Sequence, residues 1–561
     1  MNEEVDIEDF VPWFVAFITF AGGCIRVLLL AVKGLTLDET VSIWLAGFPL
    51  HDIFHWAASV NQQPPLYYFL LHCWIALRSS FPYSVRFLSV LFGVAAIPVI
   101  YLIGKHLAGP VVGLVTAVLL AVSPLHIFYA QDASMVTLLM FNAAVTLYAV
   151  IRLVTDPRSK QPIGSQFREY VHTWRMPVPE GESVQNRSGD IYKVVRQTKW
   201  RAFITRHQWL PIHSISTDLT WIVYILFTAL TLLSHSSGYL VFQTANLVVF
   251  GLILVQKLRK NPPLANLAVP SFWNWLIAQA VVLVLWIPWL VPFLQQTGSS
   301  SPRLALSVPT WPGVLGMVMS FINATSTIPT NIAIGIWALY LLVFGAGIVY
   351  FRKKVSQLIL LAAVFLLPLL TEAIVSLWRP AFSSSTLIWT TIPLFLILAA
   401  GVSQAKFRPL VIVAIGILGT LNLFAVSDYF RFYYKEDWNS AARTVAGRAE
   451  KGDLILFTSN LNEIPFDYYF IPYQDLYAIE IEKQGVPRDL AETGAVEPVM
   501  TEADIPDLNS LIQGHDRVWL VYSNESAADP SGLVPQTLSS GMNLAEKENF
   551  YGGQVQLYIR Q

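Results

Sequence analysis

The chain has 561 residues, of which 54% are hydrophobic and only 13% are charged, about half the ~25% charged fraction of an ordinary soluble protein. Its mean hydropathy is +0.52, and a water-soluble globular enzyme has no way to bury that much apolar side chain. The formal net charge is -1 and no basic block stands out, which excludes a disordered chain and a nucleic-acid-binding protein. The composition is typical of a membrane protein with many spans.

Apolar stretches of ~20 residues, the length needed to cross a bilayer, recur about eleven times along the chain. The expected spans are 12–32, 84–107, 110–130, 135–154, 219–235, 238–256, 270–293, 332–350, 355–377, 384–402 and 409–427. The first span is not a cleaved signal peptide by its sequence, because its N-terminal flank is acidic and no small-residue cleavage site follows it.

One apolar stretch, Leu66–Leu77, is only about a dozen residues long, and the basic residues decide whether it crosses the membrane. Lys and Arg concentrate in short cytoplasmic loops. If this stretch does not cross and the N-terminus is inside, every basic cluster falls in an inner loop. These clusters are Lys105–His106, 152–218, 257–260, 352–354 and 406–408. We therefore expect Leu66–Leu77 to lie along the outer surface or to dip in partway.

This topology divides the chain into a membrane domain, residues 1–427, and an extracytoplasmic domain, residues 428–561. The membrane domain carries an outer loop at 33–84, a basic cytoplasmic insertion at 155–218 without apolar periodicity, and an outer loop at 295–331. We expect the protein in the plasma (inner) membrane, with its N-terminus in the cytoplasm.

The extracytoplasmic domain has the composition of a soluble protein. Its pattern predicts a helix and then strands, namely 437–449, 453–458, 518–522 and 554–559. A small α/β domain without a catalytic motif follows from this pattern.

Carboxylates at the outer membrane surface stand out in a chain so poor in charge. Asp38 and Glu39 follow the first span directly. Two adjacent carboxylates beside a bilayer suit the binding of a cation or the acceptance of a proton, although acids also favour the first turn of a solvated helix. Asp132 lies on the same side, either as a helix cap or as a third member of the cluster. Asp38, Glu39 and Asp132 are the candidate catalytic residues, and Asp38 and Asp132 are candidate ligands of a divalent cation.

Other polar residues on this side are candidates for substrate binding. They are Gln63, Tyr67, Arg86, His235 and Glu372. Arg86 is placed either to meet a phosphate or to snorkel at the interface. His235 lies between two spans, where a single histidine is more often structural. Glu372 is expected to pair with Arg26 of the first span or with substrate.

An ordered set of short motifs resembles the GT-C glycosyltransferases, specifically the family 39-like branch that includes protein O-mannosyltransferases and lipid A aminoarabinose transferases. The motifs are L-x-x-D-E-x-x-S (Leu35–Ser42), P-P-L-Y-Y (Pro64–Tyr68), R-x-L-S-x-x-x-G (Arg86–Gly93), a Gln131-Asp132-Ala133 motif opened by Ser123-Pro124, the turn around His235, W-I-P-W (Trp286–Trp289) and K-E-D-W (Lys435–Trp438). Two departures from the family pattern occur, because Ser134–Val136 and Phe382–Thr386 lack the Arg and Tyr that members often carry there.

The resemblance implies a GT-C fold with about 11 transmembrane helices and a polyprenyl-phosphate sugar as donor, whose lipid tail stays in the bilayer. It implies an inverting displacement at the anomeric carbon, with Asp38 as general base on the hydroxyl of a lipid, glycan or protein acceptor. The leaving phosphate would meet Arg86 or a cation held by Glu39 and Asp132. No nucleotide cofactor and no nucleic-acid partner are expected.

Two other functions stay open. A transporter or flippase of a lipid-linked sugar is disfavoured because the polar residues gather at one face and no internal repeat is found. A catalytically inactive scaffold on the same fold is suggested by the two departures from the motifs.

Overall fold

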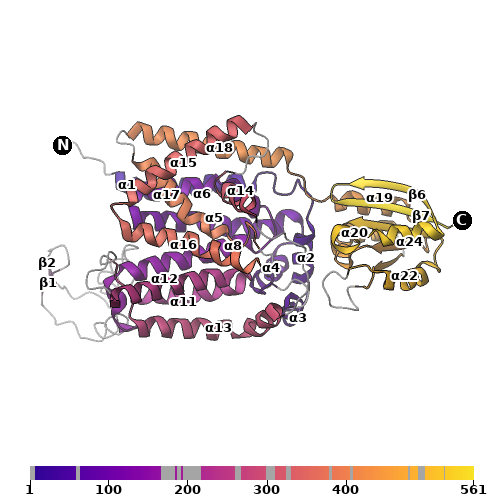
Figure 1. The fold of residues 1–561 in the computed structure, drawn as a ribbon, viewed down its shortest axis with the longest axis horizontal. Coiled ribbons are helices and arrows are strands. Elements are labelled where there is room, and N and C mark those ends of the chain that lie inside the picture. The colour runs from indigo at the N-terminus through magenta and orange to yellow at the C-terminus, as the bar shows by residue number, and fades with distance from the viewer. Residues whose placement is uncertain are drawn as a thin grey trace.

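A helical bundle and a small sheet domain make up the structure, which is a computed structural model (Figure 1). It describes residues 7–58, 63–165, 183–185, 191–193, 217–258, 267–298, 310–323, 330–377, 382–404, 408–477, 481–489, 499–523 and 525–560. Helix α1 (Ile7–Val27) begins at the end of the bundle that lies away from the sheet domain.

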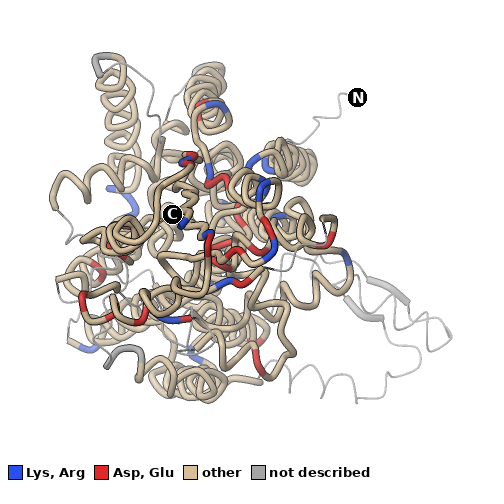
Figure 2. The backbone as a smooth tube through the Cα atoms, turned by 90° about the vertical axis from the view of Figure 1, so that its right-hand side faces the viewer, with Lys and Arg blue, Asp and Glu red and all other residues tan. Residues whose placement is uncertain are grey.

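The bundle confirms the predicted helical fold with many candidate spans. Over the described ranges, nine helices are long and apolar enough to cross a bilayer. They are α1, α5 (Pro82–Ala108), α8 (Val136–Thr155), α11 (Thr217–Ser234), α12 (Gly238–Leu258), α13 (Phe272–Gly298), α15 (Thr330–Phe351), α16 (Val355–Val375) and α18 (Arg408–Phe432). Figure 2 shows that most of the backbone carries no charge and that Lys, Arg, Asp and Glu are scattered among uncharged residues.

The two remaining expected spans are irregular. Helices α6 (Pro110–Ala121) and α7 (Pro124–Ala130) together match the expected span 110–130, but they are bent by 56° at the break between them. Pro124 causes the break, because proline lacks an N–H and disfavours the helical conformation of the preceding residue. The expected span 384–402 forms the 3-10 turn η4 (Ile388–Thr390) and helix α17 (Thr391–Ser403), which is short and buried inside the bundle.

Three short helices cover the bundle at the end that faces the sheet domain (Figure 1). They are α2 (Leu37–Ala46), α3 (Leu50–Trp56) and α4 (Leu66–Leu77). The 12 residues of α4 rise only ~18 Å, which is too short for a hydrocarbon core of ~30 Å. The prediction that Leu66–Leu77 does not cross the bilayer is therefore confirmed. Its place along the outer surface or partway into the bilayer stays a prediction.

Two expected loops differ from the prediction. The outer loop 295–331 contains helix α14 (Trp311–Ile322), which the sequence analysis did not expect. In the insertion 155–218 the structure describes the 3-10 turn η2 (Pro157–Lys160) and the antiparallel pair β1 (Ser183–Gln185) and β2 (Ile191–Lys193). Most of that insertion lies outside the described residues.

The C-terminal domain is a five-stranded mixed sheet with helices on both faces. Its elements are α19 (Trp438–Arg448), β3 (Leu454–Phe457), α20 (Glu463–Tyr477), β4 (Glu482–Gly485), α22 (Ile505–Ile512), β5 (Arg517–Ser523), α24 (Leu533–Gly541), β6 (Asn543–Phe550) and β7 (Gly553–Ile559). The strand order is β4-β3-β5-β7-β6. Strand β3 runs parallel to both of its neighbours, β4 and β5. Strand β7 runs antiparallel to both of its neighbours, β5 and β6.

The alternation of side chains explains the two layers of helices. Ile455 and Phe457 of β3 pack under α19 and α20, whereas Leu454 and Leu456 face α22 and α24. The predicted helix and the three predicted strands are confirmed. Strands β4 and β6 were missed, because edge strands with exposed and charged side chains lack an apolar pattern.

Arg26 has a different partner from the one predicted. No ion pair joins it to Glu372 in the described part of the chain. Its guanidinium donates instead to the carbonyl oxygens of Ala121 at 2.9 Å and Leu120 at 3.0 Å. These are the last carbonyls of α6. Pro124 has no N–H to offer the Leu120 carbonyl, which accepts instead from the Ser123 N–H at 3.3 Å and from Arg26. Arg26 therefore stabilises the bend.

We predict that Arg26→Met lowers the thermal unfolding temperature of the detergent-solubilised protein. The substitution removes the guanidinium donor of the Ala121 carbonyl, and a buried acceptor that loses its donor costs about 1–3 kcal/mol. Arg431→Met, at an exposed position of α18, serves as the matched control and should leave the unfolding temperature unchanged. Equal unfolding temperatures for the two variants would contradict this role of Arg26.

Candidate functional site

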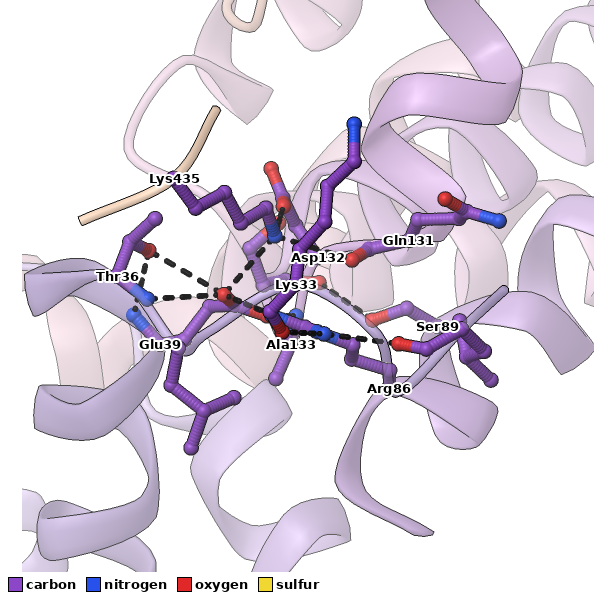
Figure 3. A network of polar contacts seen from close by, with 12 residues as sticks. Lys33, Thr36, Glu39, Arg86, Ser89, Gln131, Asp132, Ala133 and Lys435 are labelled. Carbon is purple, nitrogen blue, oxygen red and sulfur yellow. Dashed lines mark hydrogen bonds and ion pairs between the residues drawn. The ribbon is translucent and has the colours of Figure 1, made fainter. Parts of the chain in front are cut away.

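Glu39 is the centre of a buried network of charges at the end of the bundle that faces the C-terminal domain (Figure 3). Its side chain is 1% exposed. The carboxylate accepts hydrogen bonds from Arg86 Nε at 2.7 Å, Arg86 Nη2 at 2.8 Å and Lys435 Nζ at 2.9 Å. Backbone N–H groups of Ala133 at 2.9 Å and Thr36 at 3.0 Å complete the set. The Glu39 carboxylate is thus surrounded by donors of the protein, and its predicted catalytic role stays a prediction.

The local sequence explains the position of Glu39. Thr36 is the N-cap of α2, and Glu39 is the third residue of the helix. The Thr36 side chain accepts from the Glu39 N–H while the Glu39 side chain accepts from the Thr36 N–H, which is a capping box. The L-x-x-D-E motif therefore fixes the start of α2 and directs Glu39 into the protein.

Arg86 has no N–H left for a phosphate in this structure. Its two bonds to Glu39 use two of the five guanidinium donors. The other three donate to the carbonyl oxygens of Leu30 at 2.8 Å, Lys33 at 2.8 Å and Gly34 at 2.7 Å. Arg86 binds the segment between α1 and α2 and pairs with Glu39. A contact between Arg86 and a phosphate stays a prediction.

Lys435 takes the place that the sequence analysis gave to a divalent cation. Its ammonium group donates to Glu39, to Asp132 and to the carbonyl oxygen of Gln131 at 3.2 Å, so all three N–H groups are used. Among the described residues no group of three His, Cys, Asp or Glu side chains is placed to hold a metal ion. The expected cation at Asp38 and Asp132 does not fit this donor set, since Asp132 is already paired with Lys435.

The two carboxylates beside Lys435 differ in their protonation. Burial raises the pKa of Glu39, but Lys435, Arg86 and the Ala133 N–H lower it further, so that it lies well below its usual range. Burial raises the pKa of Asp132 to about 6, a shift that Lys435 opposes and the charge of Glu39 reinforces. The side chain of Asp132 is 17% exposed. Glu39 therefore stays ionised, and Asp132 is the member of the network that exchanges a proton near neutral pH.

Asp38 has a different environment from its neighbour. It lies in the first turn of α2 and is exposed. Successive residues of a helix are rotated by ~100°, so Asp38 projects from another side of α2 than Glu39. The structure thus separates the two adjacent acids into one exposed and one buried carboxylate.

Lys33 is a cation of the site that the sequence analysis missed. Its ammonium group donates to the carbonyl oxygen of Tyr429 at 2.7 Å and lies 4.0 Å and 5.2 Å from the ring centroids of Tyr429 and Tyr433. Within the described part of the chain it forms no ion pair with a carboxylate, and in Figure 3 it points away from the network. Burial, Lys435 and Arg86 lower its pKa to about 8. The sequence did contain a hint of this role. Lys33 lies on the predicted outer side, where lysine is uncommon according to the positive-inside rule.

Tyr67 and Gln63, two of the predicted binding residues, connect elements of the membrane domain. The Tyr67 hydroxyl is buried and lies 3.2 Å from Ser89 Oγ, which joins α4 to α5. Gln63 accepts a hydrogen bond from the Ser236 N–H at 2.9 Å, which joins the first outer loop to the turn between α11 and α12. A role in substrate binding stays a prediction for both.

His235 and Glu372 lie outside the Glu39 network. His235 Nδ1 accepts from the Ser237 N–H at 3.0 Å, and burial lowers the pKa of His235 to about 4, so its ring is neutral at pH 7. Glu372 is buried in α16, where its side chain hydrogen-bonds to Thr386. The structure therefore brings Glu39, Arg86 and Asp132 together and leaves these two residues in a separate polar group.

Comparison with known proteins places this site in a recognisable fold. Residues 62–167 match the family described as dolichyl-phosphate-mannose-protein mannosyltransferase. No curated protein matches the chain significantly. The crystal structure of ArnT from Cupriavidus metallidurans in the apo state is similar over 98% of each chain, with a TM-score of 0.58 at 12% identity. The apo oligosaccharyltransferase of Archaeoglobus fulgidus is similar over 100% of this chain and 75% of that chain, with a TM-score of 0.51 at 10% identity.

The chain has a GT-C fold. This confirms the fold predicted from the ordered motifs. The family match covers Arg86 and Asp132 and all of helices α5 to α8, in agreement with the family 39-like resemblance.

We predict that Glu39→Gln destabilises the protein, whereas Asp38→Asn leaves its stability unchanged. Removing the charge of Glu39 leaves Arg86 and Lys435 buried with one negative partner fewer, and breaking such a buried pair costs about 3–5 kcal/mol. The measurement is thermal unfolding of each variant in the same detergent. Equal unfolding temperatures for Glu39→Gln and wild type would show that the network is not structural.

Proposed function

We propose that this protein is a membrane glycosyltransferase that moves a sugar from a polyprenyl phosphate to an acceptor hydroxyl, at the membrane face that carries the C-terminal domain. The observation that carries the proposal is the separation of two adjacent acids, with Glu39 buried in ion pairs and Asp38 exposed beside it. The GT-C fold along the whole chain supports it, as does the partial match to a family named for a dolichyl-phosphate-linked mannose donor.

The proposed reaction is one displacement at the anomeric carbon with inversion. The oxygen of the acceptor hydroxyl attacks this carbon while its bond to the phosphate oxygen breaks, and the polyprenyl phosphate leaves with the electron pair. The hydroxyl proton passes to the carboxylate of Asp38, a step that typically contributes ~10²–10⁴-fold to the rate. Glu39 and Arg86 touch no reacting atom in this scheme and hold α2 in place.

The charge of the phosphate needs a cation, and Lys33 is the one we propose. Arg86 and Lys435 have all their N–H groups bonded within the protein, whereas Lys33 donates to the Tyr429 carbonyl oxygen and lies over two aromatic rings. The rings of Tyr429 and Tyr433 hold the ammonium group in place but carry no negative charge that would neutralise it. The ammonium group therefore keeps its positive charge for binding an anion.

We propose that the site faces the extracytoplasmic side of the plasma (inner) membrane and that the N-terminus is cytoplasmic. The basic clusters at Lys105 and at 352–354 support this orientation. They lie at the C-terminal ends of α5 and α15, and the positive-inside rule assigns helix ends with basic clusters to the cytoplasm. The acceptor is a lipid, glycan or protein that reaches this face.

A vesicle assay with a radiolabelled polyprenyl-phosphate sugar pool tests the proposed function. Wild-type protein in right-side-out vesicles should transfer label to an acceptor, and Asp38→Asn should lower this rate by ~10²–10⁴-fold. Asp52→Asn, at a partly exposed carboxylate of the neighbouring helix α3, is the matched control with unchanged transfer. Transfer that survives Asp38→Asn would remove Asp38 as the base. Movement of lipid without transfer would identify a flippase, and neither activity would identify a scaffold.

We predict that the Michaelis constant for the donor rises as the pH rises through about 8, because Lys33 loses its charge above its pKa. Lys33→Gln should raise this constant about tenfold at neutral pH and remove its dependence on pH in this range. Lys33→Arg should keep donor binding and also remove the dependence, since arginine stays charged. A Lys33→Gln variant with wild-type donor binding would exclude Lys33 from the phosphate site.

A further inference from the structure

The C-terminal domain contributes charged side chains to the network around Glu39. Lys435 and Glu436 lie between α18 of the membrane domain and α19 of the sheet domain. Lys435 is 1% exposed and bonds to Glu39, Asp132 and the Gln131 carbonyl. The buried ammonium group therefore joins the start of the sheet domain to two separate segments of the membrane domain.

Glu436 binds the start of the helix that carries Asp38. Its Oε2 accepts hydrogen bonds from the Leu37 N–H at 2.9 Å and from Trp438 Nε1 at 2.6 Å. The first N–H groups of a helix have no partner within the helix and form its positive end. A carboxylate from the sheet domain satisfies one of them in α2, next to Asp38 in the sequence.

Helix α20 of the sheet domain reinforces the same contact. The Tyr469 hydroxyl accepts a hydrogen bond from the Leu35 N–H at 2.9 Å, and the Tyr468 hydroxyl donates to the Ser80 carbonyl at 2.8 Å. Leu461 and Ile464 belong to the same buried apolar cluster as Val41, Leu45 and other residues of the outer helices. The contact is thus continuous, with apolar packing around a polar centre.

We infer that the C-terminal domain is a built-in part of the site, in which Lys435 and Glu436 are positioning residues that fix the N-terminus of α2 and hence Asp38. The ammonium group of Lys435 serves as the resident cation between Glu39 and Asp132. Because the same bonds dock the domain and order α2, docking of the domain and assembly of the site are one event. The inference depends on the proposed function only for its activity readout.

Hydrogen exchange of the full-length protein tests this inference without any substrate. Glu436→Gln and Tyr469→Phe each weaken one bond to α2, and we expect backbone amides in residues 35–40 to exchange about tenfold faster. Amides of β3 and β5 should keep their wild-type protection, which shows that the domain itself stays folded. Glu502→Gln, at an exposed position of the same domain, is the matched control. Unchanged exchange in residues 35–40 of both variants would overturn the inference.

The kinetics of the same variants separate positioning from a general loss of fold. Glu436→Gln and Lys435→Met should lower kcat about tenfold or more while the donor Michaelis constant changes less than twofold. Lys435→Arg should restore part of kcat, because it keeps the charge. Faster exchange in residues 35–40 with wild-type kcat would overturn the positioning role. If even the wild-type protein transfers no sugar, the proposed function fails, while the exchange result still decides whether the domain orders α2.

Discussion

The structure depends on one buried carboxylate, that of Glu39. Four segments far apart in the sequence meet there, because α2 supplies Glu39, α5 supplies Arg86, the link between α7 and α8 supplies Ala133 and Asp132, and the start of the C-terminal domain supplies Lys435. Moving each ion out of water costs several kcal/mol unless its partners are complete. The carboxylates of Glu39 and Asp132 pair with the cations of Arg86 and Lys435, and carbonyl oxygens accept from the remaining N–H groups, so this condition is met. The membrane domain and the sheet domain are therefore joined by the network that shapes the site.

The same network explains how two adjacent acids serve different purposes. Glu39 is paired on all sides, and its cations hold its pKa well below the usual range. Asp38 is one residue away, exposed, and free of the burial that fixes Glu39. The start of α2 is thus held by ion pairs and hydrogen bonds through Glu39, while the carboxylate next to it is exposed. A donor with its tail in the bilayer would bring its head group to that height.

Scarcity of charge made part of this site predictable. Carboxylates next to the expected spans are uncommon in such a chain, so Asp38, Glu39 and Asp132 could be singled out. The basic loops also predicted correctly that Leu66–Leu77 does not cross the bilayer. The sequence does not show which charged residues pair with one another in the folded chain. Lys435 and Glu39 are 396 residues apart, so an ammonium group took the place that was given to a metal ion. The five acceptors that surround Arg86 could not be predicted for the same reason, since they come together only in the folded chain.

The most direct test of this account is the structure of the protein determined by cryo-electron microscopy with a polyprenyl-phosphate sugar bound. The account predicts density for the phosphate within ion-pair distance of Lys33 Nζ, with the anomeric carbon facing Asp38 and the bonds between Glu39, Arg86 and Lys435 intact. A phosphate bound to Arg86 after its pair with Glu39 has opened, or a head group bound away from α2, would contradict it.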